Sequence, residues 1–309
     1  MLNMLKLITV VCLLFISFQN ETQASEKVIY GVDGRSEVYS ANRKWKVLAE
    51  STAALIALDR LEYDSSKGVY RIAENAQTTM GENLNLCQDV RFREQVHIST
   101  CSGFLVEKDI LLTAGHCATG EMADICSSGK YAWVFGYQAT QFLNTRNIEV
   151  SKENVVLCKK VLKATMNRTI DFAAIKLEKK LNKRPLKINK SKKISERSSL
   201  VVIGTPWGLP TKVTRGGRIM RNKDKYFFTA ALDTFQGNSG SAVFNEKSGE
   251  VEGILVRGKT DALMDEREYC RRVNHCDNNG NNCDYRGGFQ VGEDVMRMPF
   301  VYKQIASEL

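Results

Sequence analysis

Short apolar segments separated by polar turns run along most of this chain, and they limit its fold more than any other feature. The segments are rich in Val, Ile, Leu and Phe, and turn-forming or charged residues bound them. Many short strands favour paired barrels or sandwiches over a parallel sheet. We therefore predict an all-β protein with few helices, one of them short and C-terminal at about 299–309. The predicted strands are residues 52–58, 101–106, 111–114, 132–135, 155–157, 172–177, 200–203, 226–230, 241–244 and 251–256.

The first 24 residues have the pattern of a secretory signal. Lys6 gives a positive start, residues 7–18 are mostly apolar, and the segment ends in Thr22-Gln23-Ala24. The apolar run is shorter than the roughly 20 residues that span a bilayer, although an uncleaved anchor is the alternative. We predict a secreted or periplasmic monomer without a transmembrane anchor, consisting of residues 25–309. Cleavage removes Lys6 and Glu21, so the net charge of +9 does not change.

The cysteine content fits an oxidising compartment. Of nine cysteines, Cys12 lies in the signal, which leaves an even number for disulfides. The short spacing of Cys270, Cys276 and Cys283 suits a local bridge. The sequence does not choose among the possible pairings of Cys87, Cys126, Cys158, Cys270, Cys276 and Cys283.

Zinc and calcium are the alternatives for the C-terminal cysteine-rich region. Cys270, His275, Cys276 and Cys283 offer sulfur and nitrogen ligands, but they lack paired CxxC spacing and oxidation competes with metal binding. Residues 277–282 have the composition of a calcium loop without its alternating ligands or distal glutamate. We predict a polar turn, no metal site and no cofactor.

Three separate segments carry residues suited to nucleophilic catalysis. Ser239 lies in the glycine-framed stretch Gln236-Gly237-Asn238-Ser239-Gly240, His116 lies in TAGHC, and Asp171 opens DFAAIKL. A serine hydroxyl is a poor nucleophile until a base removes its proton and a third group orients that base. Each residue alone also suits a structural role, but together they predict a Ser-His-Asp triad in the chain order His, Asp, Ser.

TAGHC, DFAAIKL and GNSGSAVF resemble the trypsin/chymotrypsin-like serine endopeptidases, in particular the bacterial branch that includes glutamyl endopeptidases. The likeness extends from about Cys101 to Gly258. It implies two six-stranded antiparallel β-barrels, at about 45–178 and 196–298, with the active site in the cleft between them and a linker at about 179–195. It also implies a disulfide between Cys101 and Cys117, beside the histidine.

The resemblance further implies acyl transfer to water from peptide or protein substrates. His116 acts as general base, Asp171 orients it, and the backbone N–H groups of Gly237 and Ser239 form the oxyanion hole. A protease-like protein that binds without cutting is the alternative from another functional class. The linker is rich in Lys and Arg, which suits a solvated segment or weak adsorption to anionic surfaces, and it lacks the aromatic residues expected of specific nucleic-acid binding.

Substrate preference is predicted from three positions that resemble the trypsin pocket. Asp233, six residues before Ser239, corresponds to an acidic pocket floor, and Gly258 leaves room for a long side chain. Both favour cleavage after Arg or Lys. Arg257 departs from the usual tryptophan, and an acidic preference of the glutamyl type is the alternative.

Two other departures concern the pocket and its maturation. Phe235 replaces a pocket cysteine, and Asn238 replaces the aspartate that pairs with a freed amino terminus. Activation through that ion pair is therefore not expected. Residues 25 to about 45 are predicted to be either a propeptide or an added strand of the first barrel.

Overall fold

The computed structural model describes residues 28–141, 144–258, 260–284 and 292–309. Two closed six-stranded antiparallel barrels form the centre of the described structure, so the all-β prediction is confirmed. The predicted signal, residues 1–24, lies outside the described residues. No helix within the described part of the chain is long and apolar enough to cross a membrane.

The first barrel closes in the order β10-β11-β7-β6-β3-β8. Its inward side chains include Leu55, Phe104, Trp133 and Phe172, all fully buried. The pleat sends alternate residues to this interior, which explains why apolar segments mark the strands in the sequence. The strands are β3 (Thr52–Ala57), β6 (Ser99–Glu107), β7 (Ile110–Thr113), β8 (Tyr131–Phe135), β10 (Val155–Met166) and β11 (Asp171–Leu177).

The second barrel follows the order β12-β15-β16-β20-β14-β13 and closes because β13 also pairs with β12. A seventh strand, β2 (Arg35–Glu37), pairs with β13 from outside the ring. The N-terminal region therefore does add a strand, but to the second barrel and not to the first, as one of the two predictions for it states. The ring strands are β12 (Ser199–Gly204), β13 (Lys212–Arg221), β14 (Phe227–Ala231), β15 (Ala242–Asn245), β16 (Val251–Arg257) and β20 (Glu293–Arg297).

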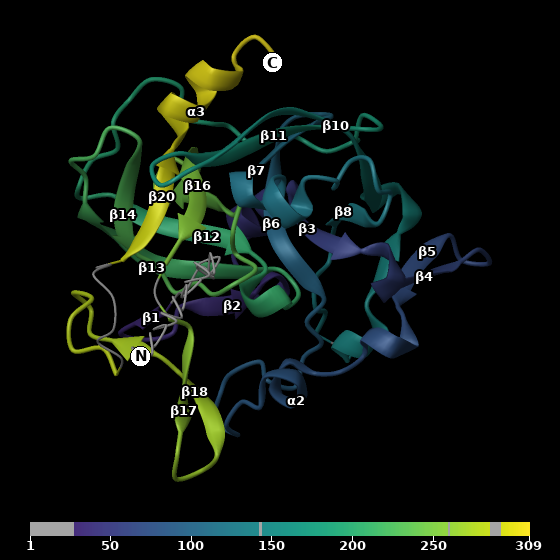
Figure 1. Cartoon of the computed structure of the whole chain (residues 1–309), viewed down its shortest axis with the longest axis horizontal. Coiled ribbons are helices and arrows are strands. Elements are labelled where there is room, and N and C mark those ends of the chain that lie inside the picture. The colour runs from purple at the N-terminus through teal and green to yellow at the C-terminus, as the bar shows by residue number, and fades with distance from the viewer. Residues whose placement is uncertain (1–27, 142–143, 259, 285–291) are drawn as a thin grey trace, which may run out of the picture.

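One continuous apolar cluster joins the two barrels. Helix α1 (Arg43–Ala49) begins at the N-cap Asn42 and inserts Trp45 edge-on against Phe244 of the second barrel. The C-terminal helix α3 (Met298–Ile305) confirms the predicted terminal helix. Its Phe300 packs against Phe172 of the first barrel, and Figure 1 shows α3 lying beside β10 and β11. The barrels are thus packed directly on each other, which fixes the relative position of residues carried by each.

Smaller elements surround the barrels. A three-stranded sheet extends from the first barrel, β1 pairs in parallel with β19, and β17 and β18 form a projecting hairpin at the bottom of Figure 1. Helix α2 (Met80–Leu84) starts with a capping box between Thr79 and Glu82. The surrounding strands are β1 (Ile29–Tyr30), β4 (Leu61–Asp64), β5 (Val69–Ile72), β9 (Glu149–Ser151), β17 (Ala262–Asp265), β18 (Cys270–Val273) and β19 (His275–Cys276).

Four disulfides link these parts. Cys101 pairs with Cys117, as the resemblance implies, and Cys276 with Cys283, which is the predicted local bridge. The other two pairs are Cys87–Cys270 and Cys126–Cys158. The sulfurs considered as zinc ligands are therefore held in S–S bonds.

Candidate active site

The pairing of β7 with β11 places His116 beside Asp171. Ala173 lies opposite Thr113 in this antiparallel pair, so the start of β11 meets the turn that follows β7. Asp171 Oδ2 lies 2.9 Å from His116 Nδ1, and Asp171 Oδ1 accepts a hydrogen bond from the His116 backbone N–H at 3.0 Å. A buried carboxylate at Nδ1 favours the tautomer that carries its proton there, which leaves Nε2 as a base.

The loop that carries Ser239 is joined to the histidine segment through its backbone. The carbonyl oxygen of Ser239 accepts a hydrogen bond from the Ser102 N–H at 2.8 Å, and it lies 3.8 Å from Cys117 Sγ. Cys117 directly follows His116, and its disulfide partner Cys101 directly precedes Ser102. Ser239, from the second barrel, is thus anchored to the residues next to His116 in the first.

Gly237 has the backbone geometry expected of a close approach. Its φ is +87°, and a Cβ atom there would lie 2.5 Å from the Thr205 carbonyl oxygen. Any other residue would be strained and would clash with this carbonyl. Within the described residues no acceptor is found for the Gly237 N–H, so this donor is available to an oxyanion.

Two further residues of this site were missed by sequence reasoning. The Ser102 hydroxyl donates to the Gly237 carbonyl oxygen at 2.8 Å, and the Thr205 hydroxyl donates to the same oxygen at 3.1 Å. Ser102 also accepts a hydrogen bond from the Thr205 N–H. Both side chains are fully buried, so they hold the Gly237 peptide group in one orientation. Ser102 lies in a predicted strand, but no motif marks its hydroxyl.

Asp233 is buried, and both its oxygens are hydrogen-bonded to the N-terminal segment. Oδ1 accepts from the Tyr30 N–H and Oδ2 from the Gly34 N–H, each at 2.7 Å. Burial raises the pKa of the Asp233 carboxyl to about 6, although these two hydrogen bonds oppose the rise. A substrate cation would have to compete with two backbone donors for this carboxylate.

The other predicted pocket residues lie near the end of β16. Gly258 directly follows this strand, and Arg257 donates through Nη1 to the carbonyl oxygen of Arg168 in the β10–β11 loop. Arg257 thus bridges the two barrels and is not paired with Asp233. Phe235 is fully buried and packs against Trp207, with ring centroids 4.1 Å apart.

The loop considered for calcium is a turn organised by its own aspartate. Asp277 Oδ1 accepts from the backbone N–H groups of Asn279 and Asn281, and Oδ2 accepts from the Asn282 side chain. The carboxylate is therefore occupied by internal hydrogen bonds, and these bonds hold its pKa below the usual range.

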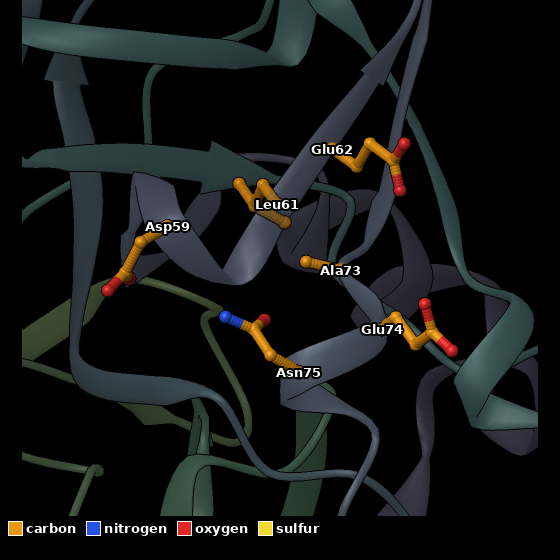
Figure 2. A pocket seen from close by; sticks show the side chains of 6 residues that line it. All are labelled: Asp59, Leu61, Glu62, Ala73, Glu74 and Asn75. Atoms are coloured by element: carbon orange, nitrogen blue, oxygen red, sulfur yellow. The ribbon is translucent and has the colours of Figure 1, made fainter.

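Figure 2 shows a separate open depression on the first-barrel side of the molecule, around β4 and β5. The three carboxylates at its rim do not converge on one point, and no predicted catalytic residue lines it. Its residues are Asp59, Leu61, Glu62, Ala73, Glu74 and Asn75.

Residues 101–254, which contain all three predicted catalytic residues, match the sequence model of the family described as trypsin-like peptidase domain. The chain carries a trypsin-like peptidase domain. This matched domain supports a serine endopeptidase, a hydrolase of peptide bonds. No curated protein matches the chain significantly in sequence.

Solved structures of proteases are similar in fold to this trypsin-like chain. The VesB protease of Vibrio cholerae is 13% identical with a TM-score of 0.50, over 91% of this chain and 68% of that one. A Glu endopeptidase is 15% identical with a TM-score of 0.49, over 91% and 98%. A serine endoprotease from Yersinia pestis is 14% identical with a TM-score of 0.46, over 86% and 64%.

Proposed function

We propose that the chain is a secreted serine endopeptidase that uses Ser239, His116 and Asp171 as its catalytic triad. The observation that carries this proposal is the double contact of buried Asp171 with the ring and backbone of His116. The anchoring of the Ser239 carbonyl beside Cys117 supports it, because it brings the nucleophile's loop to the histidine turn.

In the proposed mechanism, Ser239 Oγ attacks the carbonyl carbon of the scissile peptide bond while His116 Nε2 takes its proton. Negative charge develops on the carbonyl oxygen, where the N–H groups of Gly237 and Ser239 stabilise it. His116 then gives the proton to the leaving amine, and the acyl group remains as an ester on Ser239. Water, deprotonated by the same imidazole, hydrolyses the ester and restores the enzyme. Asp171 stabilises the imidazolium during both acylation and deacylation.

A fluorophosphonate probe tests this proposal directly. We expect the mature protein to be labelled, Ser239→Ala to lose labelling completely, and Ser65→Ala, a matched change at an exposed serine in the β4–β5 turn, to be labelled normally. Absence of labelling in correctly folded wild-type protein would contradict the proposal and favour a protease-like binding protein.

Secretion is the second part of the proposal. Four disulfides in the described residues are typical of proteins from oxidising compartments. N-terminal sequencing of the exported protein tests the predicted cleavage after Ala24, and a cytoplasmic, unprocessed product would contradict it.

Cleavage after Arg or Lys stays a separate prediction. It rests on the position of Asp233 in the sequence, and the backbone donors at this carboxylate oppose it. A peptide library, read for the residue before the cut, tests it against an acidic preference.

A further inference from the structure

The segment from β1 to the start of β2 contacts the loop of the proposed nucleophile at two points. The first contact is with Asp233, whose two oxygens accept the N–H groups of Tyr30 and Gly34. A carboxylate that accepts two short backbone hydrogen bonds is held in both position and orientation. Asp233 lies only a few residues before Gly237 and Ser239 on the same loop.

The second contact is made by Arg35. Its guanidinium lies 4.4 Å from the centroid of the Phe235 ring, and the whole residue is only 2% exposed. Asp33 holds the guanidinium by two hydrogen bonds, to Nε and Nη2. A desolvated cation over an aromatic face is an attractive and directional contact, so Phe235 is fixed from this side.

The segment itself is held by strand pairing at both ends, with β19 outside the barrels and with β13 of the second barrel. β1 pairs with β19, and β2 pairs with β13. At the end of β2, Glu37 accepts a hydrogen bond from buried Lys212 at 3.1 Å. The segment therefore presents its N–H groups and its guanidinium from a rigid frame. We call Tyr30, Gly34 and Arg35 together the N-terminal clamp.

The residue directly before the nucleophile is an amide, Asn238. Asn238 is buried, and its Oδ1 accepts only a hydrogen bond from the Ser241 hydroxyl at 3.3 Å within the described part of the chain. It carries no charge for an ion pair with an amino terminus. The clamp holds the loop at Asp233 and Phe235, and Ser102 holds it at Gly237.

We infer that the N-terminal clamp is a permanent positioning element that keeps the Asp233–Ser239 loop competent for acylation. Asp233 then acts through the loop and not on the substrate side chain. This inference rests on the proposed function. It also implies that the mature enzyme retains residues 28–37, so any maturation cut lies before Val28, and residues 25 to about 45 are not released as a propeptide.

The test compares acylation kinetics of the full mature chain with those of two variants. Asp233→Asn keeps the shape of the side chain but leaves one acceptor oxygen for two N–H groups, and Arg35→Met removes the cation over Phe235. Because a misplacement of about 1 Å can cost a hundredfold in rate, we expect the acylation rate to fall about 10- to 100-fold in each. The matched control Asp59→Asn, at an exposed carboxylate of the first-barrel side, is expected to acylate as the wild type does.

Peptide esters with Lys, Ala or Glu before the cleaved bond separate positioning from substrate recognition. The clamp predicts that the acylation rate, measured in the pre-steady-state burst, falls by the same factor for all three esters, with active-site concentrations titrated and melting temperatures measured. A fall confined to the Lys ester would overturn the inference, since Asp233 would then read the substrate. Wild-type acylation rates in folded Asp233→Asn, or in Arg35→Met if the first variant does not fold, would overturn it as well. Failure of the proposed function is distinguishable, because the wild type itself would then not be acylated.

Discussion

At the scale of single residues, the orientation of His116 depends on one buried carboxylate. Asp171→Asn replaces an acceptor of the Nδ1 proton by an amide, which favours the wrong tautomer of the imidazole. By the Ser-His-Asp template of chymotrypsin-type enzymes, we expect kcat to fall about 10⁴-fold at neutral pH. Peptide affinity should change little. Steady-state kinetics with a peptide amide substrate give kcat, and KM approximates the peptide affinity because acylation is then slow. A tenfold loss in kcat or less would show that Asp171 does not orient the base.

The proposed catalytic residues stand out in the sequence because each is embedded in a distinctive motif, and the residues that support them do not. Ser102 and Thr205 are common polar residues whose role depends on a contact between barrels. The donors to Asp233 are backbone N–H groups of Tyr30 and Gly34, and a backbone group leaves no signal in a sequence. The spacing from Ser239 predicts Asp233 as a pocket residue, but spacing does not show which donors surround its carboxylate.

At the scale of elements, a buried ion pair fastens β2 to β13. Lys212 Nζ is fully buried and donates to Glu37, to Gln95 and to the Pro210 carbonyl oxygen, while burial lowers its pKa to about 8. Lys212→Met leaves Glu37 as an uncompensated buried charge. We expect a loss of about 3–5 kcal/mol in the free energy of unfolding, measured in urea.

The double variant Lys212→Met/Glu37→Met tests whether the loss comes from the stranded charge. It removes both charges, so part of the lost stability should return. The control Lys187→Met, at an exposed position of the linker, should unfold as the wild type does. A double variant less stable than Lys212→Met alone would contradict the explanation.

The elements that were predicted from the sequence are those with apolar faces, and the missed ones lack this signal. β13 (Lys212–Arg221) closes the second barrel but contains four basic residues and two glycines, so it has no clear alternation. β1 and β2 are too short for any periodicity. Helix α2 is short too, although Thr79 and Glu82 form a capping box that the sequence displays. The three strands among these elements are decided by pairing with distant parts of the chain, and pairing is not a local property.

At the scale of the whole molecule, the disulfide between Cys87 and Cys270 joins parts of the chain 183 residues apart. The chain-entropy estimate for such a loop is about 5 kcal/mol, compared with about 2 kcal/mol for the Cys276–Cys283 bridge, which spans 7 residues. Cys87→Ala/Cys270→Ala should therefore lose clearly more stability than Cys276→Ala/Cys283→Ala. Urea unfolding under oxidising conditions compares the two variants, and equal losses would contradict the entropic account.

The stability of the whole molecule should also depend on pH through Asp233. Its pKa is about 6 in the folded protein, against an ordinary value of 3.8, because burial penalises the charged form more than its hydrogen bonds favour it. The folded state therefore binds more protons than the unfolded state between these values, so this group's contribution falls as pH rises. Through this group alone, the free energy of unfolding falls by about 2 kcal/mol between pH 4.5 and 7.5.

Asp233→Asn removes this titration, so the two proteins should differ in their pH profiles. Between pH 4.5 and 7.5, the free energy of unfolding of the wild type should fall by about 2 kcal/mol more than that of the variant. This difference does not depend on the variant's absolute stability. Urea unfolding of both proteins at both pH values gives this difference, in which contributions from all other groups cancel to first order. Parallel profiles would mean that Asp233 titrates alike in the folded and unfolded states. In that case the hydrogen bonds from Tyr30 and Gly34 would offset the whole effect of burial, or the carboxylate would be open to solvent.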